Sequence, residues 1–376
     1  MSKLFSPATL RDLILRNRTI VAPMCQYSAQ DGFANDWHFV HLGRFGMGGF
    51  GLVIAEATAV VPEGRISYAD LGLWKDEQIA PLARIVDFLH GQNTAAGIQL
   101  AHAGRKASTP VPWRHGFDET EAEKAALHFE SWTPVGPGPE IHAEGKNFTA
   151  PIALDLSGIR GVIDAFVAAA IRADKAGFDT VEIHAAHGYL LNQFLSPLAN
   201  TRSDAYGGSR DNRMRLVLEV TEAVRAVWPA GKPLLVRLSV SDWHPEGWQV
   251  EDSIALAHAL KALGVDAIHA SSGGFEGAHI TPAAEYQLSL ATAIRTETGL
   301  PTIAVGLLGD PQRAEAIVAN GEADFIALAR GALDDPNWPL HARHTLGLTD
   351  YDLWPNQASR VRERDRVLKL GGFAAS

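Results

Sequence analysis

The sequence TVEIHAAHGYLLNQFLSP, residues 180–197, joins a short apolar run to two histidines and a tyrosine. Residues 180–183 are rich in β-branched side chains and Gly188 follows closely, which predicts a buried parallel strand. His184, His187 and Tyr189 then lie just past the strand, where α/β barrels place their active sites. A single histidine there could be an ordinary packed residue, but three ring side chains within six positions predict a functional site at the end of this strand.

Apolar runs of strand length alternate with amphipathic segments of helix length along the chain. The predicted strands are residues 19–22, 52–57, 96–100, 180–183, 234–238, 266–270, 302–305 and 324–328. The predicted helices are residues 36–47, 77–90, 155–176, 212–228, 250–263, 284–298 and 310–320. This order predicts an α/β fold in which residues 1–376 form a single (β/α)8 TIM-barrel domain. A Rossmann sheet would have GxGxxG after the first strand, where Cys25 and Tyr27 stand instead.

Two segments fall outside this alternation. Residues 103–154, after the third strand, are rich in glycine and proline, and loops of that length in a compact domain are usually lids or binding loops. We therefore expect a capping insertion there. Residues 346–376 form a C-terminal tail with arginines at 360, 362, 364 and 366, and a charge run at a terminus is usually a solvated end.

Composition excludes several classes of protein. The formal net charge of -10 and the lack of a basic stripe argue against nucleic acid as a partner. The N-terminus has no continuous apolar core of a signal peptide and no later stretch approaches membrane-spanning length, so we expect a cytoplasmic protein without a membrane partner. Cys25 is the single cysteine, which excludes an intramolecular disulfide and a cysteine-based zinc cage.

The last two strands end in features typical of a phosphate site. Gly306 follows the seventh strand, and Ala329 and Arg330 follow the eighth. Barrels frequently bind a phosphate with these two loops, and an arginine adds a charge-assisted contact. The alternative is that the glycines only make turns.

Two polar residues on predicted strands indicate a ligand with a planar ring. Arg237 on a buried strand is costly unless it meets an anion, and Gln99 offers a donor and an acceptor to a heterocycle edge. A ring that gains negative charge would suit both. The alternative is an ion pair between Arg237 and a neighbouring carboxylate such as Glu56 or Glu182.

The two histidines allow two interpretations. As metal ligands they would need a third protein ligand, and His102, His41 and Glu56 form no compact signature such as HExxH. As paired imidazole donors they would stabilise charge on a carbonyl or nitro oxygen, which we favour, with no metal. Tyr189 could then supply a proton at neutral pH.

Several stretches resemble the Old Yellow Enzyme family, in its branch of bacterial NADPH dehydrogenases and xenobiotic reductases. They are APMCQYSAQDG (22–32), EATAVVPEGRIS (56–67), GIQLAHAGRKAS (97–108), GFDTVEIHAAHGYLLNQFLSPLANTRSDAYGGSRDNR (177–213), LLVRLS (234–239) and DFIALARGALDDP (324–336). The resemblance implies non-covalent FMN, NADPH or NADH as hydride donor, and hydride transfer to the β-carbon of an α,β-unsaturated carbonyl or nitro compound. The chain is thus expected to be an ene-reductase.

The resemblance also implies roles for individual residues. The flavin would be held by Pro23, Met24, Cys25, Ala57, Gln99, Arg237, Gly306, Ala329 and Arg330. His184 and His187 would bind the substrate oxygen, Tyr27 would line the pocket, and Tyr189 would protonate the α-carbon. Cys25 would tune the flavin and pack against ligands, unless it is only a small buried hydrophobe.

The tail is expected to act between subunits. Relatives in this branch form oligomers in which a C-terminal arginine reaches the neighbour's active site, and Arg360 matches that position best. The resemblance therefore implies a homodimer or homotetramer. Ala329 departs from the glycine of many relatives, and Ala358 stands where relatives often have an aromatic residue. The rival hypotheses are a metal-dependent barrel hydrolase and a flavin or ligand carrier.

Overall fold

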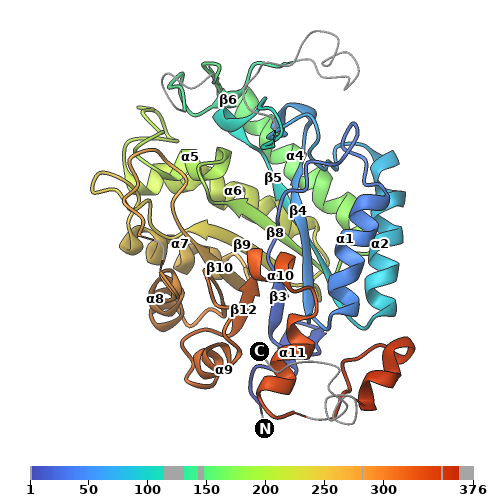
Figure 1. The fold of residues 1–376 in the computed structure, drawn as a ribbon. Coiled ribbons are helices and arrows are strands. Elements are labelled where there is room, and N and C mark those ends of the chain that lie inside the picture. The colour runs from blue at the N-terminus through green and yellow to red at the C-terminus, as the bar shows by residue number, and fades with distance from the viewer. Residues whose placement is uncertain (1, 114–130, 143–147, 282, 349, 364–376) are drawn as a thin grey trace.

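A closed barrel of eight parallel strands forms the centre of the molecule, with helices around its outer face (Figure 1). The computed structural model describes residues 2–113, 131–142, 148–281, 283–348 and 350–363. Around the ring the strands are β10 (Ala267–Ser271), β11 (Thr302–Val305), β12 (Phe325–Leu328), β3 (Thr19–Val21), β4 (Leu52–Ala59), β5 (Ala95–Ala101), β8 (Thr180–Ala185) and β9 (Leu234–Ser239). Each of the eight predicted strands overlaps one of these, so the predicted (β/α)8 barrel is confirmed.

The helices bury their apolar faces against the barrel, and several of them begin at polar caps. The side chains of Asn35, Asp155, Ser209 and Asp310 each accept a backbone N–H in the first helical turn. The helices are α1 (Asp36–Met47), α2 (Ile79–Gly91), α4 (Leu156–Lys175), α5 (Leu190–Leu195), α6 (Arg210–Val227), α7 (Val250–Ala262), α8 (Leu288–Thr298), α9 (Pro311–Ala319), α10 (Arg330–Asp334) and α11 (Trp338–Thr345). Short 3-10 turns are η1 (Pro62–Gly64), η2 (Asp76–Gln78), η3 (Gly104–Lys106) and η4 (Asn356–Glu363).

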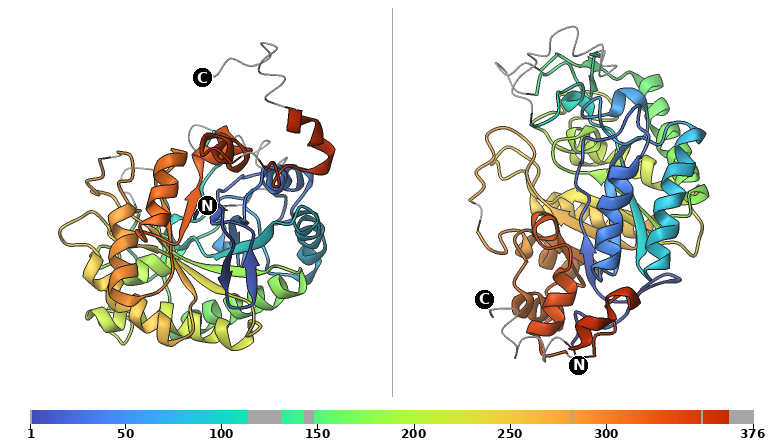
Figure 2. Two further views of the ribbon diagram at one scale, coloured as in Figure 1. Left: turned by 90° about the horizontal axis from the view of Figure 1, so that it is seen from below. Right: turned by 45° about the vertical axis from the view of Figure 1, so that its right-hand side comes forward.

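An antiparallel hairpin that the sequence analysis did not predict closes the N-terminal end of the barrel. It consists of β1 (Ala8–Leu10) and β2 (Leu13–Leu15), and Figure 2 (left) shows it in dark blue across the barrel seen from below. Leu15 is fully buried against the first residues of the barrel interior. The Arg11 guanidinium binds the Asp266 carboxylate at 2.7 Å, just before β10. The hairpin is thus fixed by apolar packing and by this ion pair.

The interior of the barrel changes character along its axis. Near the hairpin it is filled by apolar side chains from alternate strand positions, namely Ile20, Leu52, Ile54, Leu235, Ile303 and Phe325. One layer further toward the C-terminal ends of the strands it is polar, with Gln99, Glu182, Arg237 and His269 all buried. Buried polar groups are costly unless they are paired or await a ligand, so this layer marks the functional end.

The two segments outside the alternation are described in part. Within the predicted insertion 103–154, β6 (Val135–Gly136) pairs with β7 (Ile152–Ala153), at the upper end of Figure 1. Residues 114–130 and 143–147 lie outside the described residues, so the cap stays a prediction. In the tail, η4 lies at the lower right of Figure 1, and the arginines at 364 and 366 lie outside the described residues. No helix in the described part of the chain is long and apolar enough to cross a membrane.

Candidate active site

The C-terminal ends of the strands bring the predicted site residues to one rim. Arg237 on β9 has His184 of β8 as its register partner on one side and His269 of β10 on the other. On the opposite side of β8, Gln99 of β5 is in register with Glu182 and also with Ala57 of β4. Residues that are far apart in sequence therefore lie on neighbouring strands.

His184, His187 and Tyr189 form a compact cluster of rings. The His184 ring centroid lies 5.1 Å from that of His187 and 5.1 Å from that of Tyr189. Burial, reinforced by Arg237, lowers the pKa of both histidines well below the usual value, so both rings are neutral at pH 7. The Ala186 backbone N–H donates to His184 Nδ1 at 3.3 Å. The neutral His184 ring therefore carries its proton on Nε2, where it can serve as a donor.

His187 is held by two serines that the sequence analysis missed. Its backbone N–H donates to Ser239 Oγ at 2.8 Å, and its Nε2 lies 2.7 Å from Ser271 Oγ. His187 itself has φ 60°, in the left-handed region that residues other than glycine rarely adopt. A Cβ on the next residue, Gly188, would lie 2.3 Å from the Gly274 carbonyl oxygen. The imidazole thus sits on a backbone turn that only a glycine at 188 permits.

Lys106 supports the same turn and was also not predicted. Its Nζ donates to the His187 carbonyl at 2.8 Å and lies 4.8 Å from the centroid of the Tyr189 ring. Burial, with a smaller effect of Arg105, lowers the pKa of Lys106 to about 8. Burial raises the pKa of Tyr189 well above its usual value, and Cys25 acts in the same direction. The phenol consequently stays protonated at neutral pH.

The loop after β3 delivers the predicted residues Pro23, Met24, Cys25 and Tyr27 to the rim. Glu56, at a bulge of β4, accepts the Gln26 backbone N–H at 2.8 Å and lies 3.3 Å from His38 Nε2. This buried carboxylate therefore fixes the loop. Burial, with Asp70 and Glu56, raises the pKa of the Cys25 thiol well above its usual value. Cys25 is a neutral thiol here, which suits packing better than nucleophilic chemistry.

The polar layer beneath the rim is an ordered hydrogen-bond network. Gln99 Nε2 donates to Glu182 Oε1 at 2.7 Å, and His269 Nδ1 lies 2.8 Å from Glu182 Oε2. Arg237 takes no hydrogen bond or ion pair within the described part of the chain, and its Nε is buried without a partner. The direct ion pair with Glu56 or Glu182, considered from the sequence, does not form. The Arg237 guanidinium is instead free for a ligand.

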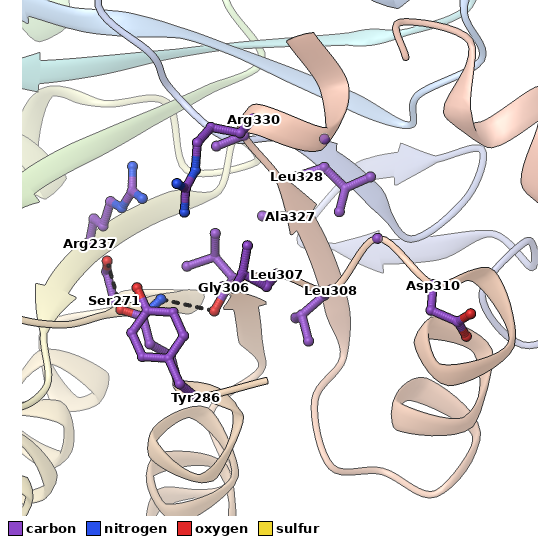
Figure 3. A pocket seen from close by; sticks show the side chains of 15 residues that line it. Arg237, Ser271, Tyr286, Gly306, Leu307, Leu308, Asp310, Ala327, Leu328 and Arg330 are labelled. Atoms are coloured by element: carbon purple, nitrogen blue, oxygen red, sulfur yellow. Dashed lines mark hydrogen bonds between the residues drawn. The ribbon is translucent and has the colours of Figure 1, made fainter. Parts of the chain in front are cut away.

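A cavity of about 490 Å³ opens beside Arg237, between the ends of β11 and β12. Figure 3 shows Arg237 and Arg330 extending toward the same hollow, while Asp310 points away from it. Gly306 has φ 118°, and a Cβ there would lie 2.8 Å from the Gln287 amide nitrogen. At Gly309 and Gly331 a Cβ would meet nothing within 4 Å. The lining residues are Arg237, Ser271, Tyr286, Gln287, Val305, Gly306, Leu307, Leu308, Gly309, Asp310, Ala327, Leu328, Ala329, Arg330 and Gly331.

This cavity has the features of an anion and ring site. Its volume lies within the range of about 300–1,000 Å³ typical of small-molecule pockets. The backbone N–H groups of Gly309, Arg330 and Gly331 donate to no group in the described residues. Two arginines and the residues that carry these N–H groups therefore line one space, as a phosphate and a ring that gains negative charge would require.

The residues considered as additional metal ligands lie apart. His41 belongs to α1 and packs its ring against Phe45, and His102 Nδ1 accepts the Gly104 backbone N–H at 3.0 Å. Over the ranges that the structure describes, no group of three or more His, Cys, Asp or Glu side chains is placed to hold a metal ion. Arg360 is exposed on η4, and Figure 1 shows η4 at the end of the molecule opposite β6.

The chain is similar to known flavoenzymes. The model of the NADH:flavin oxidoreductase / NADH oxidase family matches residues 3–349. An NADPH dehydrogenase of Bacillus cytotoxicus is 43% identical over 362 residues, which cover 96% of this chain and 97% of that protein. The solved structure of morphinone reductase gives a TM-score of 0.76 at 28% identity, covering 92% of this chain and 90% of that one. A 2-naphthoyl-CoA reductase gives 0.81 at 23% identity; this chain spans 53% of its length, and the likeness shows the fold alone.

Proposed function

The chain belongs to the NADH:flavin oxidoreductase / NADH oxidase family, and we propose that within it the protein is an ene-reductase of the Old Yellow Enzyme type. It is an oxidoreductase that uses FMN, with NAD(P)H as the electron donor. The acceptor we propose is an α,β-unsaturated carbonyl or nitro compound. The curated relatives are named NADPH dehydrogenases, which supports NADPH as the donor.

The residues around the cavity fit FMN. The unpaired guanidinium of buried Arg237 suits a ring that gains negative charge on reduction, and the exposed Arg330 with the neighbouring backbone N–H groups suits a phosphate. Gln99 has one amide hydrogen committed to Glu182, which leaves its Oε1 as an acceptor toward the ring. When bound, FMN supplies a two-electron carrier that takes hydride from a nicotinamide and passes it to a carbon acceptor.

The pair of neutral histidines carries the proposal. His184 and His187 lie side by side at the rim, next to Arg237, and His184 has its Nε2–H available. Two such donors can bind one carbonyl or nitro oxygen and stabilise the charge that develops there when hydride adds to the β-carbon. Because both rings are neutral, they bind the oxygen without transferring a proton to it.

Tyr189 is the residue that we propose as the proton donor. Hydride addition at the β-carbon leaves an electron pair at the α-carbon, and one proton completes the saturated product. The phenol lies 5.1 Å from the His184 ring and stays protonated at neutral pH. The phenolate formed after transfer would lie beside the Lys106 ammonium until solvent returns a proton.

The test begins with the purified protein. A yellow protein whose flavin absorbance bleaches on anaerobic addition of NADPH and returns on addition of 2-cyclohexenone is the expected result. Recovery of one equivalent of cyclohexanone per NADPH would complete it. A flavin that bleaches but is not reoxidised by enones or nitroalkenes would contradict the proposed acceptor, and a flavin that NADPH does not reduce would favour a carrier.

We also propose a homo-oligomer in which Arg360 reaches a neighbouring active site. The support is that Arg360 is exposed on η4, where it is open to contact by a neighbouring subunit. Light scattering should show more than a monomer, and Arg360→Ala should raise KM with FMN retained. A fully active monomer lacking residues 356–376 would contradict this.

A further inference from the structure

We propose that Glu182 is a positioning residue for the flavin: its buried carboxylate orients Gln99 and sets the charge opposite Arg237, and His269 holds the carboxylate in place. The polar layer lies directly beneath the rim, on the floor of the site. Glu182 and His269 are fully buried and Gln99 is 2% exposed, so no water competes for these contacts. The proposal rests on the proposed function only through the bound FMN.

Glu182 sets the orientation of the Gln99 amide. A carboxylate accepts hydrogen bonds but cannot donate them, so its contact with Gln99 at 2.7 Å must be made by the amide nitrogen. The amide is therefore fixed with Nε2 toward Glu182, and Oε1 is left for a donor above it. If Glu182 were replaced by an apolar residue, this orientation would no longer be imposed.

Glu182 also carries a negative charge close to Arg237. Although burial acts to raise the pKa of Glu182, His269, Arg237 and Gln99 together lower it, so the group is a carboxylate at neutral pH. Burial, followed by Arg237, lowers the pKa of His269, which is therefore a neutral donor. Burial lowers the pKa of Arg237, and Glu182 is the group that raises this pKa most. The negative charge of Glu182 thus offsets the positive charge of Arg237.

Two buried nitrogen atoms of the polar layer have no hydrogen-bond partner in the described residues. The two carboxylate oxygens of Glu182 contact Gln99 and His269, and neither makes a hydrogen bond to Arg237. Arg237 Nε and His269 Nε2 are left buried without partners in the described residues. The carboxylate therefore balances Arg237 through space while leaving its N–H groups for the cofactor. This arrangement limits how strongly the site favours a negatively charged, reduced ring.

Glu182 should therefore affect the reduction potential of the flavin in a direction that can be measured. Removing the negative charge with Glu182→Gln leaves Arg237 uncompensated, and the reduced flavin should become more stable relative to the oxidised flavin. We expect the reduction equilibrium to shift at least tenfold, which corresponds to about 30 mV more positive for a two-electron couple. FMN affinity should change less, because glutamine still offers an oxygen to Gln99.

The experiment is a midpoint-potential titration of the FMN-loaded enzyme with a reference dye, under enzymatic reduction by xanthine oxidase. Glu251→Gln is the matched control, since it removes the same charge from an exposed position on α7. No alkene enters the measurement, so failure of the proposed ene-reductase activity would be seen separately. A folded, FMN-loaded Glu182→Gln enzyme with the potential of Glu251→Gln would overturn the proposal.

A second pair of variants covers the case in which Glu182→Gln does not fold. His269→Leu removes the donor to Glu182 and should shift the potential in the same positive direction by a smaller amount, because the carboxylate is less stabilised. His269→Gln keeps an amide donor of similar size and should restore the wild-type potential. Equal potentials for the leucine and glutamine variants would contradict the proposal, since a purely structural histidine would not separate them.

Discussion

The two ends of the barrel interior are built on the same eight strands but from opposite kinds of side chain. At the hairpin end, Leu15, Leu52 and Phe325 exclude water and have no polar group to satisfy. At the rim end, Glu182 and Arg237 are buried as charges, and the Nε of Arg237 has no hydrogen-bond partner in the described residues. The first arrangement stabilises the fold, and the second costs stability to keep a site ready for ligands. Substitutions at the two ends should therefore affect different measurements.

The largest effect is expected at the rim, from the double substitution His184→Ala and His187→Ala. Loss of one such oxygen-directed donor typically costs about 10²–10³-fold in rate. For both we expect kcat/KM with an enone to fall by about 10³-fold, or about 4 kcal/mol of transition-state stabilisation. FMN content should stay near that of the wild type.

Titration of a phenol against the oxidised double variant is the direct measurement, because a phenol uses the same donors. His258→Ala, an exposed histidine on α7, serves as control. Unchanged phenol affinity in the double variant would mean that these rings do not bind the oxygen.

At the closed end, Leu15→Ala should lower the free energy of unfolding by about 3 kcal/mol, as buried leucines do when a cavity is left. The neighbouring Ile14 is 69% exposed on the same strand, and Ile14→Ala should change stability by less than about 0.5 kcal/mol. Urea unfolding measures both. Turnover of the folded Leu15→Ala enzyme should match the wild type, and a large loss of kcat would show that the two ends are coupled.

Tyr189→Phe should slow reoxidation of the flavin by an enone about 10²-fold and leave its reduction by NADPH unchanged, since only the alkene takes the proton. Stopped-flow traces of the two half-reactions separate these effects. Tyr206→Phe removes a hydroxyl that binds Glu219 outside the site and is the control. Equal slowing of both half-reactions would indicate a structural tyrosine.

A further effect is a pH dependence that belongs to the rim end. Burial raises the pKa of Asp70 to about 7, and Glu56 acts in the same direction. The unfolded chain ionises this carboxyl near its ordinary pKa, so the stability that the protonated form contributes is present below about pH 4 and is lost as pH rises toward 7. Asp70→Asn does not ionise, so the stability difference between wild type and variant should shift in favour of the variant between pH 4 and 7. Unfolding midpoints at several pH values test this, and a constant difference would contradict it.

The barrel could be predicted from sequence because its strands are continuous apolar runs that differ clearly from the amphipathic helices. The hairpin could not, because strands of three residues at 8–10 and 13–15 carry too little periodicity to be distinguished from a loop. The helix predicted at 284–298 begins only at Leu288, after Gln287 turns inward to donate to the Val305 carbonyl at 3.0 Å. That contact depends on the tertiary structure.

The site was predictable to the extent that strand ends reveal it. The same reasoning that selected His184 would have selected Ser271, which ends β10, so that signal was present and was not used. Glu182 is two residues before His184 on β8 and so shares its face, but its partners Gln99 and His269 follow from strand order around the ring. A sequence pattern indicates which face of a strand a residue lies on, but it does not indicate which residues of other strands will contact it.

The hairpin at the closed end also bears on the order of events in turnover. For the proposed reaction, with that end closed by β1 and β2, we expect nicotinamide and alkene to enter and leave through the same mouth, beside His187 and Tyr189. We expect them to compete for one binding place, so that each leaves before the other enters. Steady-state plots should give parallel lines with ping-pong kinetics, and an excess of enone should inhibit competitively against NADPH by occupying the oxidised enzyme.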